Sequence, residues 1–155
     1  MSQGQSVQIV DTFGTPGQNL FQFFPTKYAA VTLNSASGTS PQTVLTVPAG
    51  MYAYIVGIQI TVDAICTIAA AGMINTTLTT VNGAQTIALL RTYIPASAAS
   101  PAIPTVIRQT GAPGAFFATS VAGDTIQCAN NIALTAGSIR VSFGYGFSNN
   151  PIGNG

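Results

Sequence analysis

The chain has 155 residues, of which 47% are hydrophobic and only 5% are charged. Four basic residues stand against three aspartates, and the sequence contains no glutamate, histidine or tryptophan. An ordinary soluble domain carries roughly 25% charged residues, so a surface with this composition is poorly protected against self-association. The length suits a single domain, and the hydrophobic content excludes a disordered chain.

This composition also disfavours several classes of function. A net charge of +1 from scattered basic residues supplies no field for a nucleic-acid backbone. The absence of histidine and glutamate removes the commonest general bases and metal ligands. No apolar run approaches the roughly 18 residues of a membrane span, and residues 1–5 lack the features of a secretory signal. We therefore expect a soluble protein, intracellular at synthesis, without cofactor, metal, nucleic-acid or membrane partner.

Residues 1–28 predict an extended N-terminal arm. Glycines and prolines at positions 4, 14, 16, 17 and 25 interrupt every possible element of secondary structure. Two apolar clusters lie between them, Val7–Val10 and Leu20–Phe24, and the second holds three of the eight phenylalanines. A segment too interrupted to form its own core must bury this surface elsewhere. It lies either across its own domain or on a neighbouring subunit.

From Ala29 onward the pattern alternates with a period of two between closely spaced turn residues, which is typical of strands in a sandwich or barrel. About eight to ten short strands and no helix are expected. The segments that can form them, some of them brief, are residues 29–34, 43–47, 51–63, 65–69, 73–81, 85–93, 105–109, 116–120, 125–129, 132–135 and 138–147. The fold class is therefore all-β, an antiparallel, jelly-roll-like β-sandwich of about eight strands over residues 29–147, with a polar tail at 148–155.

Two local patterns make this prediction more specific. The dipeptide Asn82-Gly83 predicts a type I′ hairpin turn, because both central positions of that turn need a positive φ. Strict alternation in residues 51–63 predicts one shared face for Tyr52, Tyr54, Val56, Ile58, Ile60 and Val62. The last strand predicts another for Ile139, Val141, Phe143, Tyr145 and Phe147.

The sequence shows no pattern typical of an enzyme. A carboxylate pair or a calcium cage would have to use Asp11, Asp63 and Asp124, which all lie in turn-like settings where aspartate binds the local backbone. Cys66 and Cys128 could form a disulfide, but two cysteines in a chain of this kind are more often free, buried and apolar in character. Neither has a histidine or basic neighbour to activate it.

Two segments carry a resemblance to a known family. Residues 46–58 contain Val47-Pro48-Ala49-Gly50 followed by a β-strand with Val56-Gly57-Ile58, and residues 122–145 begin with Gly123-Asp124 and end in Gly144-Tyr145. Over about residues 42–147 this resembles small structural proteins of tailed bacteriophages. The resemblance implies a β-sandwich that trimerises on a virion, commonly as a capsid cement or decoration protein assembled in the host cytoplasm. The N-terminal arm lies outside it.

The first hypothesis is therefore a non-enzymatic virion protein, a homotrimer that stabilises the phage head by contacts with the major capsid protein. Its subunit interfaces are expected to use aromatic and aliphatic residues of the arm together with single arginines. These residues are Phe13, Leu20, Phe21, Phe23, Phe24, Arg91, Arg108 and Arg140. A tail-fibre or spike module that binds a host glycan through Tyr52, Tyr54 or Tyr93 is one alternative. A major coat protein that assembles by itself is the other.

Overall fold

The computed structural model describes residues 27–96, 106–109 and 117–151, and these form eleven β-strands and no helix. The bounds are β1 Lys27–Asn34, β2 Gln42–Thr46, β3 Tyr52–Val62, β4 Thr67–Ile68, β5 Gly72–Thr80, β6 Thr86–Ile94, β7 Val106–Gln109, β8 Phe117–Ala118, β9 Thr125–Asn130, β10 Leu134–Ala136 and β11 Ser138–Ser148. The predicted arm lies outside the described residues, except that β1 already begins at Lys27. There the Lys27 ammonium lies 5.2 Å from the centre of the Phe147 ring.

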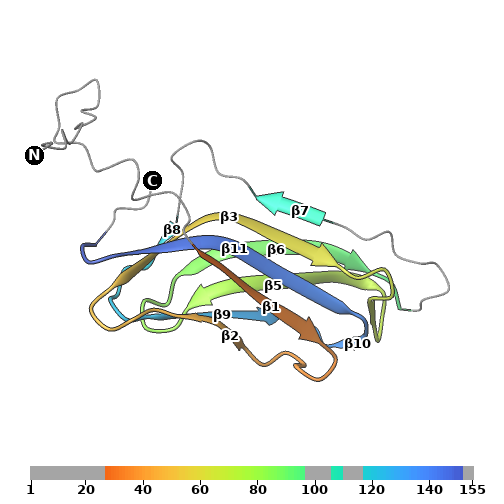
Figure 1. Ribbon diagram of the computed structural model, residues 1–155. Helices are drawn as coiled ribbons and strands as arrows, with labels where there is room; N and C mark the ends of the chain where they lie inside the picture. The colour runs from red at the N-terminus through yellow and green to blue at the C-terminus, as the bar shows by residue number, and fades with distance from the viewer. Residues whose placement is uncertain (1–26, 97–105, 110–116, 152–155) are drawn as a thin grey trace, which may run out of the picture.

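Two antiparallel sheets pack face to face, as the layers in Figure 1 show. Sheet A has the order β1-β11-β3-β7, and β8 also pairs with β3. Sheet B has the order β2-β9-β5-β6, and a short ladder joins β10 to β4. Because β7 and β8 pair with successive parts of β3, they occupy the place of one interrupted strand.

The pairing of the strands is nested. β5 and β6 form the innermost hairpin, β3 pairs with β7 and β8, β2 pairs with β9, and β1 pairs with β11. A nested ribbon of eight strands folded across two sheets is the jelly-roll arrangement. The predicted fold class is confirmed.

Apolar side chains from the inner faces of the two sheets fill the core. Phe143 and Ile60 of sheet A and Ile74, Leu78 and Ile126 of sheet B are among the largest fully buried side chains. Burying each such side chain contributes roughly 1.5–3 kcal/mol. Because the inner faces of both sheets are buried in this core, the outer faces are the surfaces available for function.

The predicted face of β3 is wrong at its start. The register between β11 and β3 shifts where Phe143 pairs with Ile58 and Gly144 pairs with Val56, which leaves Gly57 as an extra residue with a φ of 66°. This β-bulge reverses the alternation, since one inserted residue moves every earlier side chain to the opposite face. As a result Ala53 and Ile55 lie in the core.

The displaced residues, Tyr52, Tyr54 and Val56, are aligned with the outer face of β3. Tyr54 pairs with Gly146 across the strands, and a Cβ atom at Gly146 would collide with the Tyr54 ring. β11 has no inserted residue, so its predicted face is confirmed: Ile139, Val141 and Phe143 are buried, and Tyr145 and Phe147 pack against the core.

Candidate functional site

A buried carboxylate organises one end of the sandwich. Asp124 follows Gly123, whose φ is 70°, and is fully buried. Its Oδ1 accepts hydrogen bonds from the backbone N–H groups of Asn82 at 2.8 Å and Thr125 at 2.7 Å. Its Oδ2 accepts one from the N–H of Gly83 at 2.8 Å. We refer to this carboxylate with its three amide donors as the Asp124 site.

The loop between β5 and β6 is not the expected type I′ turn, and its backbone amides bind the Asp124 carboxylate instead. The positive φ in this loop belongs to Ala84, at 49°, and not to Asn82. The loop is closed instead by the Thr80 N–H, which donates to the Gln85 carbonyl at 2.9 Å. Asp124 supplies acceptors that the turn does not supply for itself, so the predicted turn type is wrong although the hairpin is present.

Gly83 is required here for space. A Cβ atom at this position would lie 2.7 Å from the Ser120 Oγ and 3.2 Å from the Asp124 Oδ2. Asp124 itself is also tied to β2, because its carbonyl accepts the Val47 N–H at 2.9 Å. Through its carboxylate and its backbone carbonyl together, Asp124 therefore joins its own loop to the loops that follow β5 and β2, which is a structural role and agrees with the turn-like setting that its sequence indicated.

The other predicted acidic residues do not join it. Asp63 is exposed just after β3, where its backbone carbonyl accepts the Cys66 N–H at 3.1 Å. Asp11 lies outside the described residues. Within the described parts of the chain, no three potential metal-ligating side chains come together, and no helix is long and apolar enough to cross a membrane.

Both cysteines are free and buried. Burial raises the pKa of the Cys66 thiol to about 11, and the nearby Asp63 carboxylate acts in the same direction. Burial raises the pKa of the Cys128 thiol to about 12, against an opposing hydrogen bond with the backbone of Ala129. The free, buried state that the sequence favoured for both cysteines is therefore confirmed, and both thiols are neutral at physiological pH.

One further polar pair lies inside sheet B. The Thr76 hydroxyl on β5 donates to the Asn130 Oδ1 on β9 at 2.8 Å, and both side chains are buried. The Asn130 Nδ2 has no hydrogen-bond partner among the residues that the structure describes.

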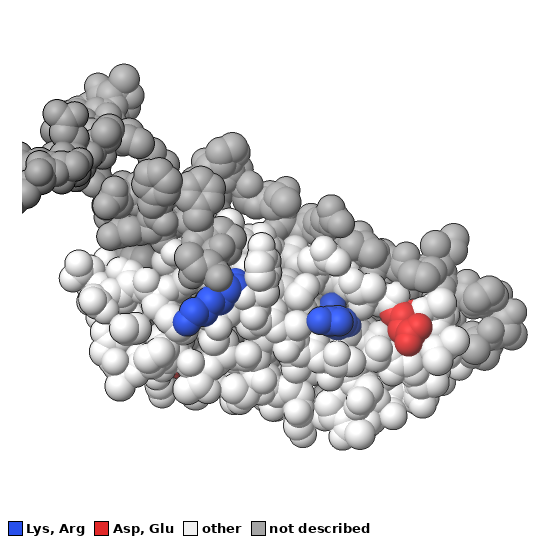
Figure 2. Space-filling view, in the orientation of Figure 1, with Lys and Arg blue, Asp and Glu red and all other residues white. Residues whose placement is uncertain are grey.

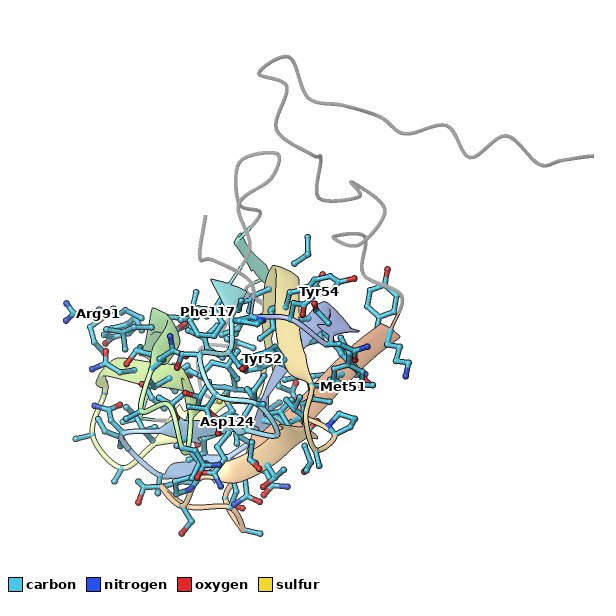
Figure 3. The ribbon with its side chains drawn as sticks, turned by 90° about the vertical axis from the view of Figure 1, so that its left-hand side faces the viewer. Met51, Tyr52, Tyr54, Arg91, Phe117 and Asp124 are labelled. Carbon is cyan, nitrogen blue, oxygen red and sulfur yellow. The ribbon has the colours of Figure 1, made fainter. Side chains whose placement is uncertain are left out.

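The outer face of the β5–β6 hairpin has the opposite character. Tyr93 pairs across the strands with Met73, Arg91 with Asn75 and Leu89 with Thr77, and alternation turns all six side chains away from the core. The exposed fractions are 62% for Tyr93 and 51% for both Met73 and Leu89. These six residues form what we call the β5–β6 outer face, and Figure 3 shows Arg91 extending from the edge of the molecule.

This face adjoins an unpaired strand edge. β6 is the last strand of sheet B, and among the described strands it pairs with β5 alone. A strand of nine residues with one free edge presents a row of backbone donors and acceptors to any chain that can add to it. Exposed apolar side chains beside such an edge are typical of an interaction surface.

The predicted interface residues are only partly placed. Arg91 lies on the β5–β6 outer face, and Arg140 is exposed on sheet A, where it pairs with Thr32 and Thr61. Arg108 lies in β7, where its backbone pairs with Gln59. The five arm residues Phe13, Leu20, Phe21, Phe23 and Phe24 lie outside the described residues.

Sequence reasoning missed Met73 and Leu89. The available signal was the alternation of residues 73–81 and 85–93, but Leu89 and Leu90 are adjacent and equally apolar. Only the pairing with β5 shows that Leu89 faces outward while Leu90 packs against the core. Comparison with known proteins finds no family model that matches the chain and no curated protein that matches it.

Proposed function

We propose that this chain is a structural virion protein, a decoration or cement protein that stabilises a bacteriophage head through contacts between subunits. The observation that carries the proposal is the β5–β6 outer face, where apolar side chains stand about half exposed beside a free strand edge. Soluble monomers rarely leave such a surface uncovered.

The distribution of charge supports the same function. Of the five charged residues whose side chains are described, Asp124 is buried, which leaves Lys27, Asp63, Arg91 and Arg140 at the surface. Figure 2 shows the basic and acidic side chains of one face standing apart from one another on an otherwise uncharged surface. A surface this poor in charge gives little protection against association, which suits a protein whose neighbours cover it.

The fold adds support by analogy. Double-sheet jelly rolls recur in viral capsid and lectin domains, although a fold alone does not determine a function. The resemblance of residues 42–147 to structural phage proteins points in the same direction. On this proposal three copies associate, and their arms and outer faces bury apolar area on one another and on the major capsid protein at roughly 25 cal/mol per Å², before the costs of association.

A particle-binding experiment tests this function. Full-length protein is added to heads that lack it, and binding and resistance of the heads to heating are compared with those of a variant without residues 1–24. A variant without residues 152–155 is the matched control for truncation. We expect the full-length and control proteins to bind and stabilise heads and the arm-deleted protein to remain folded but unbound. Failure of the full-length protein to bind heads contradicts the proposal.

The same preparations separate the alternatives. Binding to purified host polysaccharide instead of heads would indicate the glycan-binding module, for which Tyr93 and Tyr28 (80% exposed) are available and the buried Tyr54 is not. Closed shells formed by the protein alone in electron micrographs would indicate a coat protein. A monomeric mass at every concentration tested contradicts every hypothesis in which the protein assembles.

A further inference from the structure

We propose that residues 7–13 of a neighbouring copy add as an antiparallel strand to the free edge of β6, with Asp11 of one copy paired with Arg91 of the next. This inference rests on the proposed assembly and names the surface and the segment that perform it. It follows from the edge, from the charges and from the pattern of side chains along both segments.

The edge determines the kind of partner. Among the described strands, β6 pairs with β5 alone and so leaves one edge of its nine residues unpaired, and its outward side chains Leu89, Arg91 and Tyr93 lie on one face. An extended segment that joins such an edge gains main-chain hydrogen bonds, and its alternate side chains meet those of the edge strand.

The charges identify the segment. Arg91 is exposed and pairs across the strands with Asn75, which carries no charge. The sequence contains only three side-chain carboxylates: Asp124 is occupied by backbone amides, and Asp63 lies just after β3 of the other sheet. Asp11 is the remaining one, and residues 1–26 contain no basic side chain. A guanidinium and a carboxylate bind each other in a directional way that fixes register.

The pattern of side chains fits the same register. When Asp11 lies opposite Arg91 in an antiparallel pair, Ile9 lies opposite Tyr93 and Phe13 lies opposite Leu89. Both segments therefore present the order apolar, charged, apolar on one face. A shift by one residue would place Asp11 opposite an inner-face position and remove every one of these pairs.

The position of β1 favours a neighbouring copy as the donor. The arm leaves from β1, which packs beside β2, and β2 is the edge of sheet B opposite to β6. An arm folding back would have to cross the sandwich to reach its own β6. Residues 14–26 can span at most about 45 Å, which is long enough for residues 7–13 to leave their own subunit and reach a neighbouring copy. Because donor and acceptor surfaces differ, repetition of this contact closes a ring when the rotation permits.

Disulfide trapping in the full-length protein tests the inference. Asp11→Cys and Arg91→Cys variants are purified separately, mixed and oxidised mildly, and the products are separated without reductant. Asp11→Cys mixed with Arg140→Cys is the matched control, since Arg140 is also exposed but lies on the other sheet. The natural thiols are buried and do not compete. We expect a covalent dimer that joins positions 11 and 91 and none in the control mixture.

A charge exchange provides a second measurement. Asp11→Arg or Arg91→Asp alone should weaken self-association by about tenfold, and the double variant should recover it. Equal trapping at positions 91 and 140, or an intramolecular disulfide in the Asp11→Cys/Arg91→Cys double variant at monomer mass, overturns the inference. Trapping at position 91 without binding to heads leaves the inference standing and contradicts the proposed function. Arm-dependent binding to heads without trapping at position 91 supports the proposed function and contradicts the inference.

Discussion

Two regions of the β5–β6 hairpin differ in how far their side chains are buried and bonded within the chain. At its turn, the Asp124 carboxylate is fully buried and receives three backbone N–H groups from within the same chain. On its outer face, Met73, Leu89 and Tyr93 are more than half exposed beside an unpaired edge. A satisfied buried group holds a fold together, whereas an uncovered apolar face is a surface for association. The buried carboxylate of Asp124 therefore has a structural role, whereas the exposed apolar residues of the β5–β6 outer face carry the proposed function.

The largest effect is expected at the Asp124 site. Asp124→Ala leaves three backbone amides without their acceptor and should lower the free energy of unfolding by about 3 kcal/mol, measured by urea denaturation. Asp63→Ala is the control and should change it by less than about 0.5 kcal/mol, because that side chain is exposed. Equal losses in the two variants would show that the buried carboxylate is not the anchor.

Unfolding at alkaline pH tests the contribution of Cys128, a residue of β9 that pairs with Leu78 of β5. The pKa of this thiol rises from 9.0 to about 12 on folding. A raised pKa means that the stabilisation is complete below pH 9.0 and is lost as the pH rises toward 12, since the unfolded thiol ionises first. We expect a loss of about 2 kcal/mol between about pH 9 and 11.

Cys128→Ala is the matched variant for this measurement. It should be less stable at neutral pH, because it leaves a cavity, but its unfolding free energy should decline less steeply above pH 9.0. An unchanged alkaline slope in this variant contradicts the role assigned to the thiol.

A smaller effect is expected from Gly83→Ala at the turn. The added methyl group must displace Ser120, whose Oγ would lie 2.7 Å away, and should lower the unfolding free energy by between about 1 and 2 kcal/mol. Adding Ser120→Ala should restore part of this loss, because it removes the closest atom. A double variant less stable than the sum of the two single changes would point to the backbone and not to steric contact.

The smallest effect on folding is expected at the β5–β6 outer face. Leu89→Ser and Tyr93→Ser should each change the unfolding free energy of the isolated chain by less than about 0.5 kcal/mol. Both should nevertheless weaken self-association in sedimentation experiments. Ile65→Ser, at a residue 57% exposed elsewhere, serves as the control and should leave association unchanged. If Leu89→Ser and Tyr93→Ser lowered stability but left self-association unchanged, the outer face would have a structural role and would not be a surface for association.

Much of the fold could be predicted because its signals are local. The alternation of apolar residues and the turn residues located the described strands to within a few residues, and the Pro48-Ala49-Gly50 turn is present, with the Met51 N–H donating to the Pro48 carbonyl at 3.1 Å. The site could not be predicted in the same way. Asp124 lies 42 and 41 residues away from Asn82 and Gly83, whose amides donate to it, and no residue next to Asn82 and Gly83 indicates this contact.

The sequence by itself determined the all-β class, the strand positions and the scarcity of charge, because each follows from composition or from a period of two along the chain. The tertiary structure decided three things that depend on contacts between separate segments of the chain. The bulge at Gly57 reversed the start of β3, Asp124 replaced the expected turn, and the pairing of β6 with β5 exposed Leu89 instead of Leu90. In the first two cases a partner far along the chain, and in the third the neighbouring strand of the hairpin, selected between conformations that local preference leaves nearly equal in energy.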